Sequence, residues 1–227
     1  MVRFSSLRSD LTERLSQVGE VWRILERLES PELQFSKPGL RSLKGLLFVQ
    51  LYATYEFTVV NSFAATIREL NSHLIPLNRL NLPTLGLALH QEFQKFQTTK
   101  ESKGWLTRIS LLELSHSSAA STILEELFPV ADCQYRPPQL EIICQLLALP
   151  PGALLPDVRF KSWIEEVVEN RNAIAHGREA AEGIGGRISI TDLKHKVDQL
   201  NELCNHILTT LEGYSSTRSS FERHLSI

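Results

Sequence analysis

The sequence has few cysteines and no pairing pattern among them. Cys133, Cys144 and Cys204 are the three cysteines of 227 residues, so their number is odd and they lie far apart. No CxxC pair is present, and no histidine or second cysteine stands at zinc-site spacing from any of them. We therefore expect a reducing, cytoplasmic compartment, with no disulfide framework, no metal site and no cofactor.

The sequence also lacks a long uninterrupted apolar run. Its most apolar stretch, residues 43–63, contains Lys44, Gln50, Glu56 and Asn61, which are too many polar groups for a span that faces lipid. The first residues lack the apolar segment of a signal peptide. The stretch is therefore expected to form a buried helix, and no membrane contact is expected.

A strong excess of either charge is missing as well. The chain has 24 lysines and arginines against 26 aspartates and glutamates, which gives a net charge of −2. A chain with this balance has no overall attraction to nucleic acid. Any nucleic-acid site must therefore be a local basic pocket rather than a broad basic surface.

Common motifs of hydrolases and nucleotide-binding folds are absent. The sequence has no Gly-x-Ser-x-Gly nucleophile motif and no HExxH metal motif. The glycine-rich residues 183–187 follow no strand pattern, which excludes a P-loop or a dinucleotide site. We expect the whole glycine-rich stretch 177–189 to be a flexible loop.

Helical periodicity is the dominant positive signal. Apolar residues near the N-terminus recur at alternating spacings of four and three and end before Pro31, which marks one stripe of an amphipathic helix. We expect this helix to pack on or beside the core, and a partner-binding or dimerising helix is the alternative. A second helix, apolar nearly all round, is expected over residues 39–71. The stripe consists of Leu11, Leu15, Val18, Trp22 and Leu25.

The remaining chain predicts further helices and no strand alternation. One helix opens with Asp157 as N-cap and stops at Gly177, and a final helix is capped by Thr191 and runs to about residue 211. The fold class is therefore all-α, with an N-terminal helix in residues 1–36 and a helical domain in residues 37–227. An insertion of short helices spans about residues 76–156. These short helices are expected over residues 87–97, 106–115, 121–128 and 137–149.

The most informative segment is residues 169–177, Glu-Asn-Arg-Asn-Ala-Ile-Ala-His-Gly. It resembles the RxxxxH signature of the HEPN superfamily, in the form Arg-Asn-x-x-Ala-His-Gly found in its ribonuclease and toxin branch. The segment falls between a capped helix and a glycine-rich stretch that precedes another long helix, which is similar to the order of the last two core helices of that family. Residues 51–56 are similar to its first core helix. The resemblance covers roughly residues 40–70 and 157–213.

This resemblance implies a fold and an activity. The fold is a HEPN-like four-helix bundle that pairs into a homodimer, and the activity is metal-independent endonucleolytic cleavage of RNA. It implies a bacterial toxin–antitoxin or phage-defence setting, with an antitoxin or sensor protein as a further partner. Some HEPN toxins carry a tyrosine two residues after the motif histidine, which their antitoxin modifies. Arg178 occupies that position here, so that form of control is not expected.

The chemistry of metal-free RNA cleavage fits the same residues. The reaction needs a base for the 2′-OH, an acid for the leaving 5′-oxygen and a cation for the charge on phosphorus. His176 is the candidate proton-transfer residue and Arg171 the candidate phosphate stabiliser. One histidine supplies only one of the two proton transfers, and a two-fold dimer would supply the second.

Helix geometry adds supporting groups. Arg171 shares a helix side with Phe160, Ile164, Val167 and Ile174, where an unpaired charge is costly. Glu56 also lies on an apolar side of its own helix, so we expect it to pair with Arg171. His176 is about 140° round the helix from Arg171, whereas Asn172 shares the side of His176 and is expected to orient the imidazole or the phosphate. The supporting groups are therefore Asn172 and Glu56.

Basic residues beyond the motif are candidates for holding the RNA backbone. Arg178, Arg187 and Lys194 stand near His195 and Lys196 in the sequence and are expected to form a basic rim. The alternative is a solvated helix surface.

Two other functions remain open. A non-catalytic HEPN module would bind a nucleotide, an RNA or a partner protein, with Arg171 and Glu56 as a structural pair and His176 as a capping residue. A helical adaptor would have no ligand. Convergence of both copies of Arg171 and His176 on one cleft would favour the enzyme.

Overall fold

The computed structural model describes residues 2–30, 36–98, 101–125 and 134–223. Within these ranges the chain is helical, and β-type pairing is limited to isolated bridges between Pro76 and Ala120 and between Leu80 and Glu222. The all-α prediction is confirmed. Among the described helices, none combines the length and the apolar composition that a membrane crossing requires.

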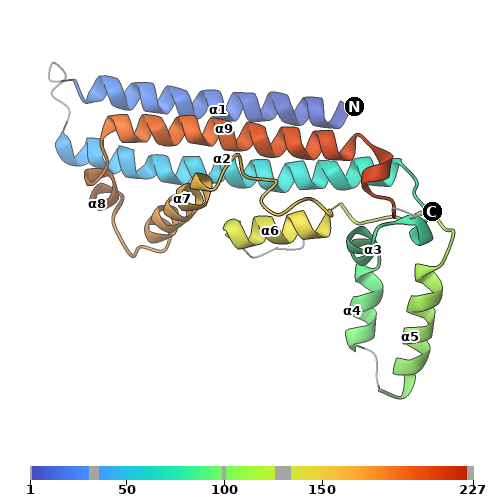
Figure 1. The fold of residues 1–227 in the computed structure, drawn as a ribbon. Coiled ribbons are helices and arrows are strands. Elements are labelled where there is room, and N and C mark those ends of the chain that lie inside the picture. Colours follow the sequence, from blue (N-terminus) through green and yellow to red (C-terminus); the bar gives the residue numbers. More distant parts are fainter. Residues whose placement is uncertain (1, 31–35, 99–100, 126–133, 224–227) are drawn as a thin grey trace.

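Three long helices lie side by side and form the body of the molecule (Figure 1). They are α1 (Val2–Leu28), α2 (Lys37–Ser72) and α9 (Ile190–Ser215). The hydroxyl of Ser36 accepts a hydrogen bond from the backbone N–H of Gly39 and caps α2. Helix α9 is capped by Ser189, which accepts from the N–H of Asp192 at 3.0 Å, so the prediction that Thr191 caps this helix was wrong.

Helix α1 packs against both α2 and α9. Leu11, Val18 and Leu25 of its predicted stripe are buried, and Leu15 and Trp22 are partly buried against the same core. The indole N–H of Trp22 also donates to the carbonyl oxygen of Ile190 at 3.1 Å, which ties α1 to the start of α9. Each fully buried leucine contributes about 1.5–3 kcal/mol relative to an exposed one, so α1 is an integral part of this core.

Helix α7 (Arg159–Ala175) carries the motif and packs against α2 and α9. Its N-cap position is Val158, one residue later than expected, and Val158 makes no side-chain capping bond. Asp157 acts from outside the helix, where its carboxylate accepts from the N–H of Arg159 at 2.7 Å. Trp163 and Ile164 are buried on the inner side of α7.

The glycine-rich stretch contains a helix, so the prediction of a flexible loop was wrong. Helix α8 (Ala181–Gly186) crosses α2 at backbone contact distance. A Cβ atom at Gly185 would lie 1.8 Å from the carbonyl oxygen of Arg41, and one at Gly45 would lie 2.0 Å from the carbonyl oxygen of Ala181. The glycines therefore serve close helix packing rather than mobility, and they hold the chain that follows the motif against α2.

The short elements of the middle of the chain differ in part from expectation. The predicted helix over residues 87–97 is two helices, α3 (Leu82–Ala88) and α4 (His90–Thr98). Residues 121–125 form no helix, which contradicts the start of the helix predicted there, and the rest of that prediction lies outside the described residues. The other elements are η1 (Leu77–Arg79), α5 (Glu101–Ser115), α6 (Pro137–Leu146) and η2 (Arg218–Ser220).

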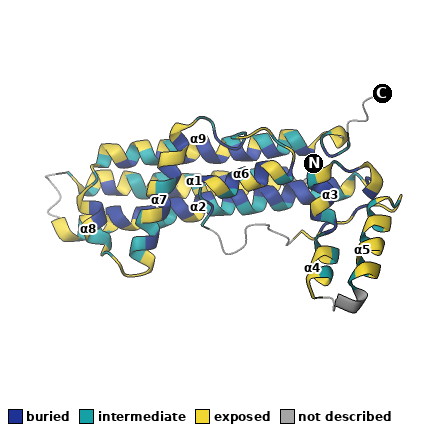
Figure 2. Cartoon of the chain, turned by 60° about the horizontal axis from the view of Figure 1, so that its bottom comes forward, coloured by how far each residue is buried: buried dark blue, intermediate teal, exposed yellow. Residues whose placement is uncertain are grey.

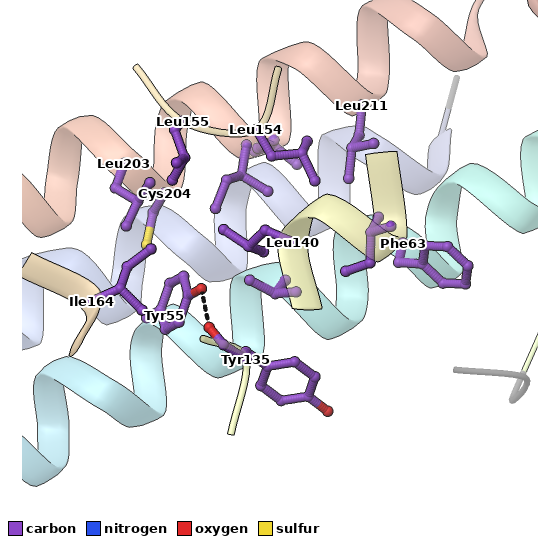
Figure 3. Packing of buried hydrophobic residues seen from close by; sticks show 14 of the residues in the cluster. Tyr55, Phe63, Tyr135, Leu140, Leu154, Leu155, Ile164, Leu203, Cys204 and Leu211 are labelled. Atoms are coloured by element: carbon purple, nitrogen blue, oxygen red, sulfur yellow. Dashed lines mark hydrogen bonds between the residues drawn. The ribbon is translucent and has the colours of Figure 1, made fainter. Parts of the chain in front are cut away.

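Helix α6 and the residues before it are tied into the core beside α7 (Figure 3). The hydroxyl of Tyr55 on α2 donates to the carbonyl oxygen of Tyr135 at 2.6 Å. Leu140 of α6, Ile164 of α7 and Cys204 of α9 point into the same interior. Because Tyr135 is held in this way, the neighbouring residues 134 and 136 are placed against the end of α7.

Candidate functional site

The motif segment forms the last turn of α7 and a tight reversal after it. His176 is the C-cap, and its backbone N–H donates to the carbonyl oxygen of Asn172 at 3.0 Å. Gly177 has a φ of +66°, a left-handed conformation that glycine adopts without steric cost. The N–H of Arg178 then turns back to the carbonyl oxygen of Ala173 at 2.9 Å. The helix therefore stops at Gly177 as predicted and leaves the His176 side chain exposed.

Arg171 lies on the side of α7 that faces α2. Its guanidinium carbon stands 4.4 Å from the centre of the Tyr52 ring, a cation–π contact. Its Nη1 donates to Oδ1 of Asn172 at 2.8 Å. The residue as a whole is half-buried.

The expected ion pair between Glu56 and Arg171 is not formed, although both residues are in the described part of the chain. Tyr52 contacts both residues instead. The guanidinium of Arg171 stacks on the Tyr52 ring, and the Tyr52 hydroxyl donates a hydrogen bond to Oε1 of Glu56 at 3.2 Å. Tyr52 precedes Glu56 by one helical turn, so both side chains lie on one side of α2. Burial, and then the Glu56 carboxylate, raise the pKa of Tyr52, while Arg171 opposes that rise.

Asn172 supports Arg171 rather than His176. Its side chain is buried, and its Nδ2 donates to Oε1 of Gln134 at 2.6 Å while its Oδ1 accepts from Arg171. Within the described residues, no hydrogen bond reaches the imidazole of His176 from Asn172 or from any other side chain. A buried amide with both ends engaged is held in one orientation, so Asn172 holds Arg171 in place.

Glutamates and arginines surround this core of the site. Arg136 donates to Gln134 at 3.3 Å, forms an ion pair with Glu165 and contacts Glu169 at 3.2 Å. Glu169 in turn pairs with Arg178 at 2.9 Å. Its hydrogen bonds to Arg178 first and to Arg136 second lower the pKa of Glu169. Arg178 is thus tethered beside the end of α7, close in sequence to His176.

The predicted basic rim is brought together only in part. Arg187, His195 and Lys196 line a cavity of about 370 Å³ between α7, α8 and α9, which also involves Asn170 of the motif segment. Lys194 lies elsewhere, paired with Asp198 and 5.3 Å from the Trp22 ring on the side of α1. Arg187 is bound to Glu179 at 2.5 Å. Of the three predicted basic residues, Arg187 lines this cavity, whereas Arg178 pairs with Glu169 and Lys194 with Asp198.

Three residues of the site were missed by sequence reasoning. Tyr52 lies in the segment 51–56 that resembles the first core helix, and its position one turn before Glu56 was an available signal. Gln134 and Arg136 precede α6 and are distant from the motif in sequence, so no local pattern marks them. In the described parts of the chain, no group of three or more His, Cys, Asp or Glu side chains is arranged to hold a metal ion.

Fold and motif together define a helical bundle of the HEPN class, in which a core helix ends in Arg-Asn-x-x-Ala-His-Gly. A family model described as "HEPN_MAE_28990:/-like HEPN" matches residues 4–219, nearly the whole chain. The chain belongs to this family, and the superfamily assignment made from the motif is confirmed. The match includes α1 and the inserted helices, which the motif resemblance did not cover. No curated protein and no solved structure matches the chain.

Proposed function

We propose that this protein is a metal-independent endoribonuclease that acts as a homodimer, with Arg171 and His176 of both copies in one composite site. The observation that carries the proposal is the contrast between these two side chains at the end of α7. Arg171 is held by Tyr52 and Asn172, whereas the His176 ring is exposed with no described hydrogen-bond partner. A fixed cation and a solvent-accessible imidazole at the end of one helix suit phosphate binding and proton transfer.

The fixed cation would act on the phosphate. As the 2′-oxygen attacks phosphorus, negative charge grows on the non-bridging oxygens, and a guanidinium already in place stabilises that charge without reorganising. Stacking on Tyr52 and the bond to Asn172 leave Arg171 with free N–H donors, because a guanidinium has five. Arg171 is thus suited to binding non-bridging phosphate oxygens.

The two histidines would move the protons. One copy of His176 takes the proton from the 2′-OH as the new bond from the 2′-oxygen to phosphorus forms. The other copy gives a proton to the 5′-oxygen as its bond to phosphorus breaks. The products are a 2′,3′-cyclic phosphate and a free 5′-OH, so protons and bonds balance. A single chain places one imidazole at the end of α7, which is why the proposal requires two copies.

Basic residues around Arg171 and His176 would contact the rest of the RNA. Arg178 is paired with Glu169 and sits at the exposed reversal after His176, where a nucleotide flanking the cleaved bond would pass. Arg187 lines the cavity beside α7 with His195 and Lys196, a polar pocket into which a base can fit. Lys194 would contact RNA only over the surface on the side of α1. We place this nuclease in a toxin–antitoxin or phage-defence setting under the control of a second protein.

A non-catalytic HEPN module that binds nucleotide, RNA or protein is the second candidate. The observation in its favour is that Arg178 and Arg187 each have a glutamate partner, so the basic groups outside the motif are neutralised. Such a module would bind its ligand without consuming it. Its binding would depend on the cavity residues Arg187 and His195 rather than on His176.

The test is RNA cleavage in EDTA by the wild-type protein, by His176→Ala and by Arg171→Ala, followed by analysis of the RNA ends. His116→Ala is the matched control, because it removes an exposed imidazole that follows α5 and lies outside the site. Cyclic-phosphate ends from wild type and His116→Ala, with no cleavage by the two motif variants, would support the nuclease. Equal cleavage by wild type and His176→Ala would refute it. RNA binding without cleavage by a folded dimer would favour the module.

A further inference from the structure

Helices α4 and α5 form a hairpin that projects from the bundle at the end away from α7 and α8 (Figure 1). The hairpin meets the rest of the molecule at its base, where α4 contacts α3 and α5 contacts η1. None of the side chains described in either helix is buried, and Figure 2 colours the described parts of both as exposed or intermediate. The hairpin is therefore a helical pair without an interior of its own.

Large apolar side chains on this hairpin face solvent. Trp105, Ile109 and Leu112 follow one another at spacings of four and three, so they form one stripe along α5, and they are 71%, 51% and 61% exposed. Leu106 flanks the stripe and Phe93 of α4 is exposed as well. These five residues are the hairpin face.

The hairpin face is large enough for a specific interface. If a fully exposed side chain of this size offers about 200 Å², the five exposed fractions leave on the order of 600 Å² of apolar surface on one protomer. This is the upper end of the largest patch found on ordinary monomers, about 300–600 Å². Two such surfaces in contact bury on the order of 1,200 Å², which reaches the range of specific protein interfaces.

The charge of the hairpin favours a partner of the same kind. The described side chains of its two helices include Glu92 and Glu113 against Lys95 and Arg108, so they carry no net charge together. The guanidinium of Arg108 is also engaged, 4.6 Å from the Trp105 ring and 5.3 Å from the Phe96 ring. A neutral apolar surface does not attract an anionic polymer, and two copies of it do not repel each other.

We infer that the hairpin face docks on the hairpin face of a second copy of this chain. Two antiparallel helix pairs brought together form a four-helix bundle, which would give α4 and α5 a shared core. A two-fold contact is self-complementary, so the stripe of Trp105, Ile109 and Leu112 would meet itself. This contact would bury the apolar side chains of the hairpin face, which are exposed in a single chain.

The inference does not depend on the proposed nuclease site. The hairpin and α8 lie towards opposite ends of the long helices, so the hairpin face is separate from the end of α7 (Figure 1). A dimer through the motif and a dimer through the hairpin can exist in the same protein and would together link four or more copies.

The experiment is sedimentation velocity of the full chain over a wide concentration range, for wild type and three variants. Ile109→Glu and Trp105→Ala alter the hairpin face. Ile24→Glu on α1 is the matched control, because Ile24 is 53% exposed and is also a helical isoleucine. We expect both hairpin variants to lower the mass of the wild-type assembly at least twofold and Ile24→Glu to leave it unchanged, with the helical circular dichroism of all three equal to wild type.

Cross-linking is a second test, which detects the hairpin contact directly rather than through a variant that weakens it. Ile109→Cys should form a covalent dimer under mild oxidation, because a residue near a two-fold axis meets its own copy. An unchanged mass in both hairpin variants, or no cross-link at residue 109, would overturn the inference. So would a hairpin variant that lowers only the mass of a complex with another protein, since the hairpin would then serve that protein.

Discussion

The guanidinium of Arg171 stacks on the ring of Tyr52, with 4.4 Å between the guanidinium carbon and the ring centre. The contact joins the motif helix α7 to the long helix α2 and keeps an arginine at the surface in one orientation. Tyr52 also bonds to Glu56, so a carboxylate and a guanidinium that were expected to meet directly are linked through one aromatic side chain.

Tyr52 is expected to act as a positioning residue for Arg171. Tyr52→Leu removes the stacked ring and should lower kcat/KM for RNA cleavage about tenfold, the value of a cation–π contact of about 1–2 kcal/mol. Tyr52→Phe keeps the ring and loses only the bond to Glu56, so its kcat/KM should stay within about threefold of wild type. Equal losses in the two variants would show that the hydroxyl, and not the ring, is what matters.

Asn172 is expected to contribute to stability as well as to the site. Asn172→Ala removes the buried amide that joins Gln134 to Arg171 and should reduce the free energy of unfolding by about 1–3 kcal/mol, measured by urea denaturation. Asn205 on α9 is exposed and bonds to Asn201 on the same helix. Asn205→Ala should therefore change stability by less than about 0.5 kcal/mol. A neutral Asn172→Ala would contradict the buried network.

A single methyl group added at the glycine contact between α8 and α2 should destabilise the fold. Gly185→Ala places a Cβ at 1.8 Å from the carbonyl oxygen of Arg41, so the helices must separate. We expect a loss of about 1–3 kcal/mol in thermal or urea unfolding. Gly213 on α9 has no atom near its would-be Cβ, and Gly213→Ala should stabilise by about 0.5–1 kcal/mol. If both variants lose stability equally, close packing is not the reason.

Alkaline pH should destabilise the fold in part through Cys204. Burial raises the pKa of this thiol from 9.0 to about 12. A folded-state pKa above the unfolded value favours the protonated thiol in the native protein, so this contribution is complete below about pH 9 and is lost as the pH rises through about 12. Urea midpoints between neutral pH and pH 10.5 should therefore fall more steeply for wild type than for Cys204→Ala. Parallel pH curves would exclude Cys204 as a contributor.

The composite site predicts how mixed dimers behave. When wild type and His176→Ala are mixed in equal amounts and allowed to exchange subunits, about a quarter of the dimers are wild type in both chains. If each cleavage needs both imidazoles, activity should fall to that fraction rather than to half. A mixture with half the activity would indicate that each chain cleaves alone. His116→Ala in the same mixture should leave activity near wild type, because this exposed residue lies outside the site.

Local sequence patterns determined those helices and helix ends that depend on residues close together in the sequence. The stripe of Leu11, Val18 and Leu25 predicts α1 because residues at those spacings share one side of a helix. The stop of α7 at Gly177 follows from the conformational freedom of glycine. The motif from Arg171 to His176 is local in the same sense, and it was sufficient to identify the HEPN superfamily.

Only the tertiary structure decided which side chains meet. Periodicity places Glu56 and Arg171 on apolar sides of two helices, but it does not show that Tyr52 stands between them. Gln134 reaches Asn172 because the hydrogen bond from the Tyr55 hydroxyl to the carbonyl oxygen of Tyr135 holds the residues before α6 against α7. Helix α8 forms although glycine disfavours helices, because Gly185 and Gly45 allow it to pack against α2. Such contacts depend on how distant segments pack, whereas helix periodicity depends on residues within about four positions of each other.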